Sequence, residues 1–176
     1  MERCLNDELL QGPDLTNLLV GVLILFPKEQ VAFMGDIEAM FHQVYIPESQ
    51  RSFMRFLWWP GGDVYGGVED YEICVHSFGD TSSGGCAKFF LRKATKNGER
   101  QFGPEAARTV LRNFYMDDLL KSTDNIDRAK DLIMKLIKMC EEGGFKLTKF
   151  LSSNREVLKF IPTECLVCIS SRLRYS

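Results

Sequence analysis

Apolar residues recur at helical spacing in several segments of the chain, and each such segment predicts an amphipathic helix. The clearest lies between Asp124, which is suited to cap its first turn, and Gly143-Gly144, which is suited to end it. Its apolar positions are Ile126, Ala129, Ile133, Leu136 and Cys140. Other helices are predicted over 15–26, with Asp14 as the cap, over 86–96 and over 104–112.

Short apolar or alternating runs separate these helices and predict β-strands. They cover residues 31–36, 55–59, 71–75 and 145–151, and two more short runs flank Asp117-Asp118. The order is strand, helix, strand pair, helix and strand, with antiparallel hairpins among the helices. It predicts an α+β fold in which helices cover one face of an antiparallel sheet.

Two adjacent acidic residues, Asp117 and Asp118, interrupt an otherwise apolar run from Phe114 to Leu120. The flanking residues predict two short buried strands, with both acids at the tight turn between them. Neighbouring carboxylates in such a setting repel each other and lose hydration, so a cation should compensate them. Asp36 ends another apolar strand, and carboxylates from neighbouring strand ends can converge on one site.

A pair of divalent metal ions is the natural candidate for that cation, because aspartate oxygens are hard ligands. Two metal ions ~3.5–4 Å apart activate an attacking hydroxyl and stabilise a leaving oxygen, which is the chemistry of nucleotidyl transfer. The alternative is structural: Asp36 caps a turn, and Asp117-Asp118 form an ordinary polar hairpin turn. We favour the metal interpretation because the acids recur beside two apolar strands.

The net charge of −2 over 176 residues gives no overall signature of a nucleic-acid-binding protein, which is usually basic. Positive charge is nevertheless concentrated in one predicted helix, which could face phosphates or be a solvated surface. That helix carries Lys88, Arg92, Lys93, Lys96 and Arg100. The apolar run from Leu18 to Phe26 is too short to cross a bilayer, so we expect no membrane association.

Six blocks of the sequence, in this order, resemble the palm region of a reverse transcriptase, and more narrowly that of BEL/Pao-type LTR retrotransposons. The blocks are residues 5–15, 35–44, 56–59, 78–83, 113–118 and 143–149. The Tyr-Met-Asp-Asp block at 115–118 is moderately specific by itself, and all six in register make a strong signal. The resemblance covers residues 5–162 and implies the palm fold of the DNA/RNA polymerase superfamily.

The resemblance implies an RNA-directed DNA polymerase that extends a primer 3′-hydroxyl by two-metal nucleotidyl transfer. Asp36 and Asp117 would be the principal ligands of Mg²⁺ or Mn²⁺, and Asp118 would complete the acidic cluster. The carbonyl of Ile37 would reach the second ion. The implied partners are template-primer nucleic acid, a deoxynucleoside triphosphate and the remainder of a retroelement polyprotein.

Further residues match positions around the incoming nucleotide in these enzymes. Phe41 stands where an aromatic ring excludes the 2′-hydroxyl, and its structural alternative is a core aromatic. Phe78 and Gly79 match the loop over the nucleotide and template, where glycine lets the backbone approach closely. Lys149 matches a lysine near the triphosphate, and Lys146 competes with it for that role.

The chain also departs from the family pattern. Asp80 and Gly84 stand where relatives usually carry a small residue such as Ala and a Pro, and both changes count against full activity. We expect residues 1–162 to be a partial palm without fingers or thumb, and 163–176 to be an unassigned tail. The chain would be a nucleotidyltransferase by type and inactive in isolation. Its expected location is a cytoplasmic retroelement particle, with the nucleus as the alternative.

Two alternative functions stay open. The first is a non-catalytic remnant of a retrotransposon polymerase that keeps the palm fold. The second is a metal-dependent phosphoesterase that uses the same acids; such sites usually add histidine ligands, and the chain has only His42 and His76. The polymerase hypothesis requires Asp36 and Asp117 to lie on the same side of a sheet.

Overall fold

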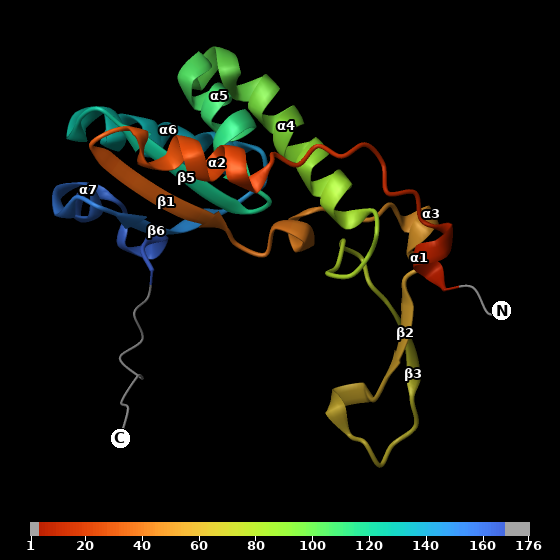
Figure 1. The fold of residues 1–176 in the computed structure, drawn as a ribbon. Helices are drawn as coiled ribbons and strands as arrows, with labels where there is room; N and C mark the ends of the chain where they lie inside the picture. The colour runs from red at the N-terminus through yellow and green to blue at the C-terminus, as the bar shows by residue number, and fades with distance from the viewer. Residues whose placement is uncertain (1–3, 168–176) are drawn as a thin grey trace. The chain divides into compact units, whose positions relative to one another are not determined.

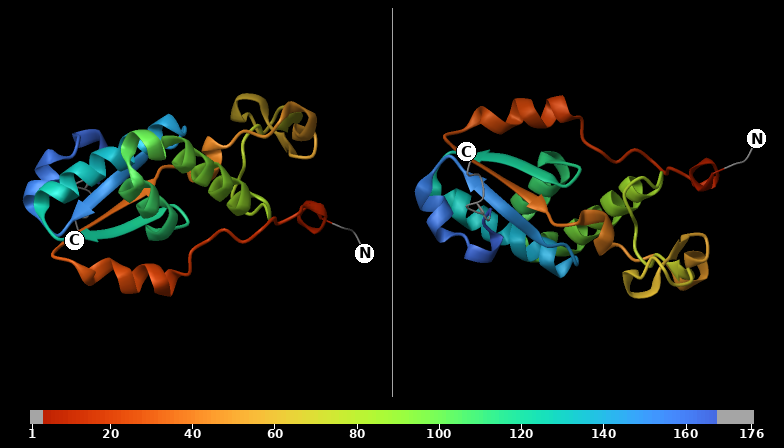
Figure 2. Two further views of the ribbon diagram at one scale, coloured as in Figure 1. Left: turned by 90° about the horizontal axis from the view of Figure 1, so that it is seen from above. Right: turned by 90° about the horizontal axis from the view of Figure 1, so that it is seen from below.

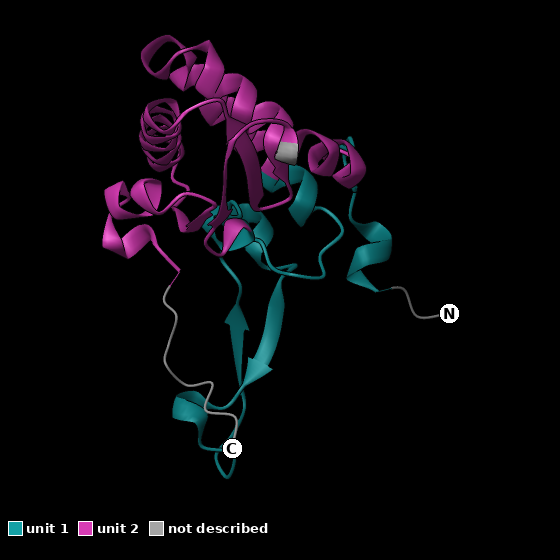
Figure 3. Cartoon of the chain, turned by 60° about the vertical axis from the view of Figure 1, so that its left-hand side comes forward, with its two compact units in different colours: residues 1–14, 41–87 teal, residues 15–40, 88–176 magenta. Residues whose placement is uncertain are grey.

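The structure, a computed structural model, describes residues 4–167 (Figure 1). The chain divides into two compact units (Figure 3). Unit 1 combines the segment that ends at Asp14 with residues 41–87, and unit 2 combines residues 15–40 with the chain from Lys88 onward. Within the described residues, no helix is both long enough and apolar enough to cross a membrane.

Unit 1 contains a two-stranded antiparallel sheet and short helices. Its strands are β2 (Arg55–Trp58) and β3 (Glu69–Glu72), and its helices are α1 (Leu5–Glu8) and α3 (Glu48–Arg51). The strand predicted over 71–75 is therefore displaced toward the N-terminus. The reason is that Val75 pairs with Tyr45 in an isolated bridge and so does not extend the hairpin.

Unit 2 is built on a four-stranded antiparallel sheet with the order β4-β5-β1-β6. The strands are β1 (Val31–Ile37), β4 (Phe114–Tyr115), β5 (Asp118–Thr123) and β6 (Leu147–Ser152). Burial alternates along β1, with Val31, Phe33 and Ile37 buried and Asp36 on the more exposed face. The central strand thus has one face for the core and one for other contacts.

Helices cover the buried face of this sheet. α6 (Ile126–Glu142) packs across β5, β1 and β6, and α5 (Pro104–Asn113) packs on β5 and beside α6. α7 (Arg155–Phe160) lies against β6 and α6. α2 (Leu19–Leu25) runs alongside β5 at the edge of the sheet (Figure 2). The predicted α+β class with an antiparallel sheet is confirmed.

The longest helix, α4 (Ser83–Phe102), begins before and ends after its predicted limits of 86–96. Gly98 lies inside it, and a Cβ there would come 3.2 Å from both Met139 and Phe102. The glycine therefore permits close packing with α6, which outweighs its poor helix propensity.

Two predicted helix caps are wrong. α6 is capped by Asn125, whose side chain accepts the Arg128 N–H, while Asp124 forms an ion pair with the Arg128 guanidinium. The helix predicted from residue 15 begins only at Leu19 and has no side-chain cap. Residues 15–18 are held in an irregular conformation by tertiary hydrogen bonds, since Asn17 donates to the carbonyls of Leu111 and Phe114.

The tail expected at 163–176 is described only in part. Residues Thr163–Cys165 form a 3-10 turn, and Leu166 bridges to Phe150 of β6. Residues 168–176 lie outside the described part of the chain.

Candidate functional site

The β4–β5 hairpin carries two of the predicted acids. Tyr115 pairs with Asp118 across it, so the loop consists of Met116 and Asp117 alone. Asp117 lies in the turn as predicted, but Asp118 is the first residue of β5, which corrects the expectation that both acids occupy the turn. A two-residue hairpin loop requires positive φ at its first residue, and Met116 has φ of 52°. For a residue with a side chain, that conformation costs about 1 kcal/mol or more.

The third acid lies directly across the sheet from this hairpin. Asp36 of β1 is the register partner of Asp118 of β5, so both side chains leave the same face. The backbone N–H of Ile37 donates to the carbonyl of Asp117 at 3.0 Å, which fastens the turn to the end of β1. The fold therefore brings all three predicted acids to one end of the sheet. Ile37 itself is fully buried.

The acids affect one another electrostatically. The pKa of Asp118 is raised, first because burial removes hydration from its carboxylate, and then because Asp117 and Asp36 repel its charge. The ammonium of Lys149 acts in the opposite direction on the same group. A carboxylate with a raised pKa beside two others marks a place where a cation would be stabilised.

That ammonium reaches the acids because β6 contains a bulge. Asp36 pairs with Thr148 and Met34 pairs with Leu151, so two residues of β6, Lys149 and Phe150, stand opposite Gly35. Lys149 has φ of 52°, and its Nζ lies 2.7 Å from Oδ1 of Asp36. The pKa of Lys149 is raised by this hydrogen bond and by the charge of Asp36.

The other candidate lysine has a different partner. Nζ of Lys146 lies 2.5 Å from Oε2 of Glu38, and the Glu38 N–H donates to the Lys146 carbonyl. The pKa of Glu38 is lowered by its hydrogen bond with Lys146. Of the two lysines that the sequence left open, it is Lys149 that contacts a predicted catalytic acid.

The donor set suits a hard divalent ion, because carboxylate oxygens from Asp36, Asp117 and Asp118 would be the ligands. Within residues 4–167, however, no group of three His, Cys, Asp or Glu side chains has an arrangement that would hold a metal ion. One oxygen of Asp36 is instead engaged by Lys149. The residue types fit Mg²⁺ or Mn²⁺, and the metal site stays a prediction.

Three of the predicted nucleotide-binding residues belong to unit 1. The rings of Phe41 and Phe78 meet edge to face with centroids 4.8 Å apart, and Phe78 is 69% exposed. Gly79 has φ of 96°, a conformation that requires glycine, and its carbonyl accepts a hydrogen bond from Asn6. Phe41 is half-buried, so it is not a core aromatic.

Asp80, which departs from the family pattern, has a structural role that was not predicted from the sequence. Its Oδ2 accepts hydrogen bonds from the backbone N–H and the hydroxyl of Ser77, at 3.2 and 2.6 Å. It shapes the turn before α4. The signal was available in the sequence, since Ser and Asp three residues apart in a glycine-containing loop are typical of a side-chain-stabilised turn.

The basic cluster on α4 divides into a buried and an exposed part. Arg92, Lys93, Lys96 and Arg100 are exposed, but Lys88 is only 4% exposed and lies over the ring of Phe114. Burial, followed by repulsion from Arg92, lowers the pKa of Lys88 to about 8, and the charge of Asp117 opposes that shift. Lys88 therefore does not belong to a surface for phosphates.

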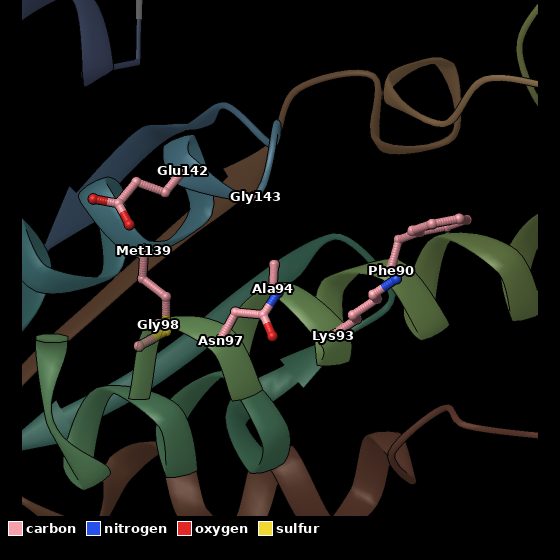
Figure 4. Close-up of a pocket in the computed structure, with 8 residues that line it drawn as sticks. All are labelled: Phe90, Lys93, Ala94, Asn97, Gly98, Met139, Glu142 and Gly143. Carbon is pink, nitrogen blue, oxygen red and sulfur yellow. The ribbon is translucent and has the colours of Figure 1, made fainter. Parts of the chain in front are cut away.

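A separate cavity of about 290 Å³ lies between α4 and α6 (Figure 4). It is lined by residues such as Phe90, Asn97, Met139 and Glu142, and none of the predicted site residues lines it. A Cβ on Gly143 would come 2.4 Å from the Cβ of Ala94, so the two helices approach closely beside it. The acidic site is on the sheet and not in this cavity.

Comparison with known proteins supports the fold. No family profile matches the sequence, and no curated protein matches it. Among solved structures, the chain is similar to a foamy viral protease-reverse transcriptase in complex with an RNA/DNA hybrid, with a TM-score of 0.56 and 16% sequence identity. The similarity covers 75% of this chain and 15% of the length of the viral chain. The chain thus has a reverse transcriptase-like fold.

Proposed function

We propose that this chain is part of the palm of a reverse transcriptase, in which Asp36, Asp117 and Asp118 are the catalytic acids. The observation that carries the proposal is the juxtaposition of Asp36 and Asp118 across β1 and β5, with Asp117 in the adjoining turn. Sheets do not favour like charges directly opposite each other, so a functional reason for keeping them is needed. Catalysis in a reverse transcriptase palm would be such a reason, and the reverse transcriptase-like fold is consistent with it.

Bound Mg²⁺ or Mn²⁺ would activate the primer 3′-hydroxyl and neutralise the triphosphate. Asp36 and Asp117 would hold the metal ions, together with the carbonyl of Ile37. Asp118 adds negative charge, and its raised pKa is a cost of folding that a bound cation would offset. Phe41, Phe78, Gly79 and Lys149 would contact the nucleotide.

The wider context belongs to the same proposal. Residues 1–162 would be a palm of the DNA/RNA polymerase superfamily, and the six sequence blocks favour a BEL/Pao-type LTR retrotransposon as its source. Template-primer, deoxynucleoside triphosphate and the rest of a polyprotein would be its partners, in a cytoplasmic particle. The viral neighbour was solved with an RNA/DNA hybrid, which supports a similar nucleic acid for this chain.

Metal binding is the first test of the proposal. Titration with Mn²⁺, followed by electron paramagnetic resonance, should show binding to the whole chain, and Asp36→Asn and Asp117→Asn should weaken it at least about tenfold. Asp131→Asn is the matched control, because Asp131 is an exposed aspartate that pairs with Lys135 on α6. Equal affinity in Asp36→Asn and the unsubstituted chain would contradict the proposal.

Nucleotide incorporation separates the candidate functions. On an RNA template with a DNA primer, incorporation that is lost in Asp117→Asn identifies a polymerase. Such incorporation rules out the non-catalytic remnant, whereas a chain without incorporation fits both the remnant and a partial palm that is inactive in isolation. Release of nucleotide without a primer identifies a phosphoesterase, for which the structure gives little support, since His42 contacts Phe78 and His76 contacts Ser83 within unit 1.

A further inference from the structure

The bulge in β6 changes which side chains reach each face of the sheet. Side chains alternate along a regular strand, so Thr148, opposite Asp36, would be followed by Lys149 on the helix-covered face. The extra residue shifts this alternation. Phe150 then enters the core, where it is completely buried, and Lys149 is free to turn toward Asp36.

This arrangement is not what chain conformation alone would select. Lys149 adopts φ of 52°, a region in which residues with a side chain are strained, and strain of this kind persists where surrounding structure or function requires it. A glycine would satisfy the backbone better. The lysine side chain makes one specific contact in return, the 2.7 Å ion pair with Asp36.

The ion pair places a positive charge where a metal ligand is proposed. The carboxylate of Asp36 is 23% exposed and the side chain of Lys149 is 56% exposed, so the pair lies at the surface of the acidic site. An exposed pair of this kind is weak, and it can open without unfolding. A cation that binds the carboxylate of Asp36 therefore competes with the Lys149 ammonium for the same oxygens.

We propose that Lys149 is a built-in counter-ion of Asp36 that a divalent cation must displace, so that this positioning residue sets how tightly the acidic site takes up metal. The proposal rests on the function proposed above. While paired, the ammonium neutralises part of the charge of Asp36, Asp117 and Asp118. When a divalent ion binds Asp36, the lysine side chain is released from the carboxylate and turns toward solvent.

The test is a Mn²⁺ titration of the whole chain and five variants. Lys149→Met removes the competing charge and keeps the side-chain length and the strained backbone, so it should tighten Mn²⁺ binding about three- to tenfold. Lys149→Arg keeps the charge and should bind like the unsubstituted chain. Lys146→Met is the matched control, because Lys146 pairs with Glu38 and not with Asp36. In an Asp36→Asn chain, adding Lys149→Met should have no further effect.

A second measurement needs no substitution. Lysine amines are acetylated with and without Mg²⁺, and the modified peptides are quantified by mass spectrometry. Mg²⁺ should increase the modification of Lys149, because its amine is released from Asp36, and should leave Lys146 unchanged.

The outcomes separate this proposal from the proposed function. If Asp36→Asn abolishes Mn²⁺ binding but Lys149→Met binds as the unsubstituted chain does, the counter-ion role is overturned and the metal site stands. A Lys149 that Mg²⁺ leaves equally reactive overturns it as well. If Asp36→Asn and Asp117→Asn bind Mn²⁺ normally, the metal site itself is wrong.

Discussion

Asp36 and Asp118 face each other across two hydrogen-bonded strands, and Asp117 follows in the adjoining turn. The sequence predicted this gathering because acids inside apolar runs are costly unless they have a common partner. It could not predict which cation is nearest, since the contact between Lys149 and Asp36 joins residues far apart in the chain. It also missed Lys88, whose burial depends on the packing of α4 against Phe114.

Removing one negative charge from the acidic site should stabilise the fold. Because the pKa of Asp118 is raised in the folded state, folding favours its protonated form, and stability is lost as pH rises through that pKa. Asp118→Asn should therefore increase the free energy of unfolding at pH 7 by ~0.5–1 kcal/mol, measured by urea denaturation. It should also remove the part of the acid-range pH dependence that Asp118 causes.

Asp131→Asn is the control for this measurement, since it breaks an exposed i,i+4 ion pair with Lys135 and should change stability by less than ~0.5 kcal/mol. A loss of stability in Asp118→Asn would show that its carboxylate is better compensated than the site geometry indicates.

The burial of Lys88 predicts the opposite pH dependence, in which stability rises as the pH rises. Its pKa falls from 10.5 to about 8 on folding, so the buried ammonium costs ~3 kcal/mol below pH 8. The unfolded chain binds the proton more tightly, so stability should rise between pH 8 and 10.5. Lys88→Met should stabilise the protein by ~1–3 kcal/mol at pH 7 and abolish this rise, in denaturant titrations at several pH values.

The comparison for Lys88 is Lys96→Met, at an exposed position of the same helix, which should leave both the stability and its pH profile nearly unchanged. A destabilised Lys88→Met would mean that the ammonium makes a favourable interaction that outweighs its desolvation.

At the scale of elements, strong apolar periodicity predicted helices correctly. The errors arose where tertiary contacts outweighed the local pattern. The apolar spacing of α6 placed that helix correctly along the chain, because one face of it is buried in the core. The segment before α2 has similar apolar spacing, but side-chain hydrogen bonds from Asn17 to distant carbonyls hold it out of the helix. The β6 bulge has no signal in local pattern, since it is defined by the register against β1.

Gly35 tests how tightly β1 and β6 pack at this bulge. A Cβ there would lie 3.1 Å from the ring of Phe150, which is completely buried. Gly35→Ala should therefore destabilise the protein by ~1–3 kcal/mol through overpacking. The measurement is the free energy of unfolding from denaturant titration.

The rescue variant for this position is Gly35→Ala combined with Phe150→Leu, which provides room for the added methyl group and should cost less than the two substitutions summed. If the free-energy changes of the two substitutions simply add, the two side chains do not contact each other.

At the scale of the whole chain, the predicted site residues are divided between two compact units. Asp36, Asp117, Asp118, Ile37 and Lys149 belong to unit 2, whereas Phe41, Phe78 and Gly79, which are predicted to contact the nucleotide, belong to unit 1. Sequence order alone could not show this division, because unit 1 combines an N-terminal segment with residues 41–87, which are inserted between β1 and the greater part of α4. The reverse transcriptase-like fold spans 75% of the chain.

An exposed apolar surface on α2 leads to a prediction for the whole chain. Val22 is the one buried residue of this helix, while Val20 and Ile24 are 67% and 70% exposed and lie one turn apart. Contiguous apolar surface of this kind promotes association, so the chain should self-associate as its concentration rises. Val20→Glu with Ile24→Glu should keep it monomeric in analytical ultracentrifugation and change its thermal midpoint little, because neither side chain contributes to the core.

Val22→Glu should instead unfold the protein, since its carboxylate would be buried without a partner. A chain that stays monomeric at every concentration would show that the α2 surface is too small to drive association, and the double variant would then differ from it only in charge.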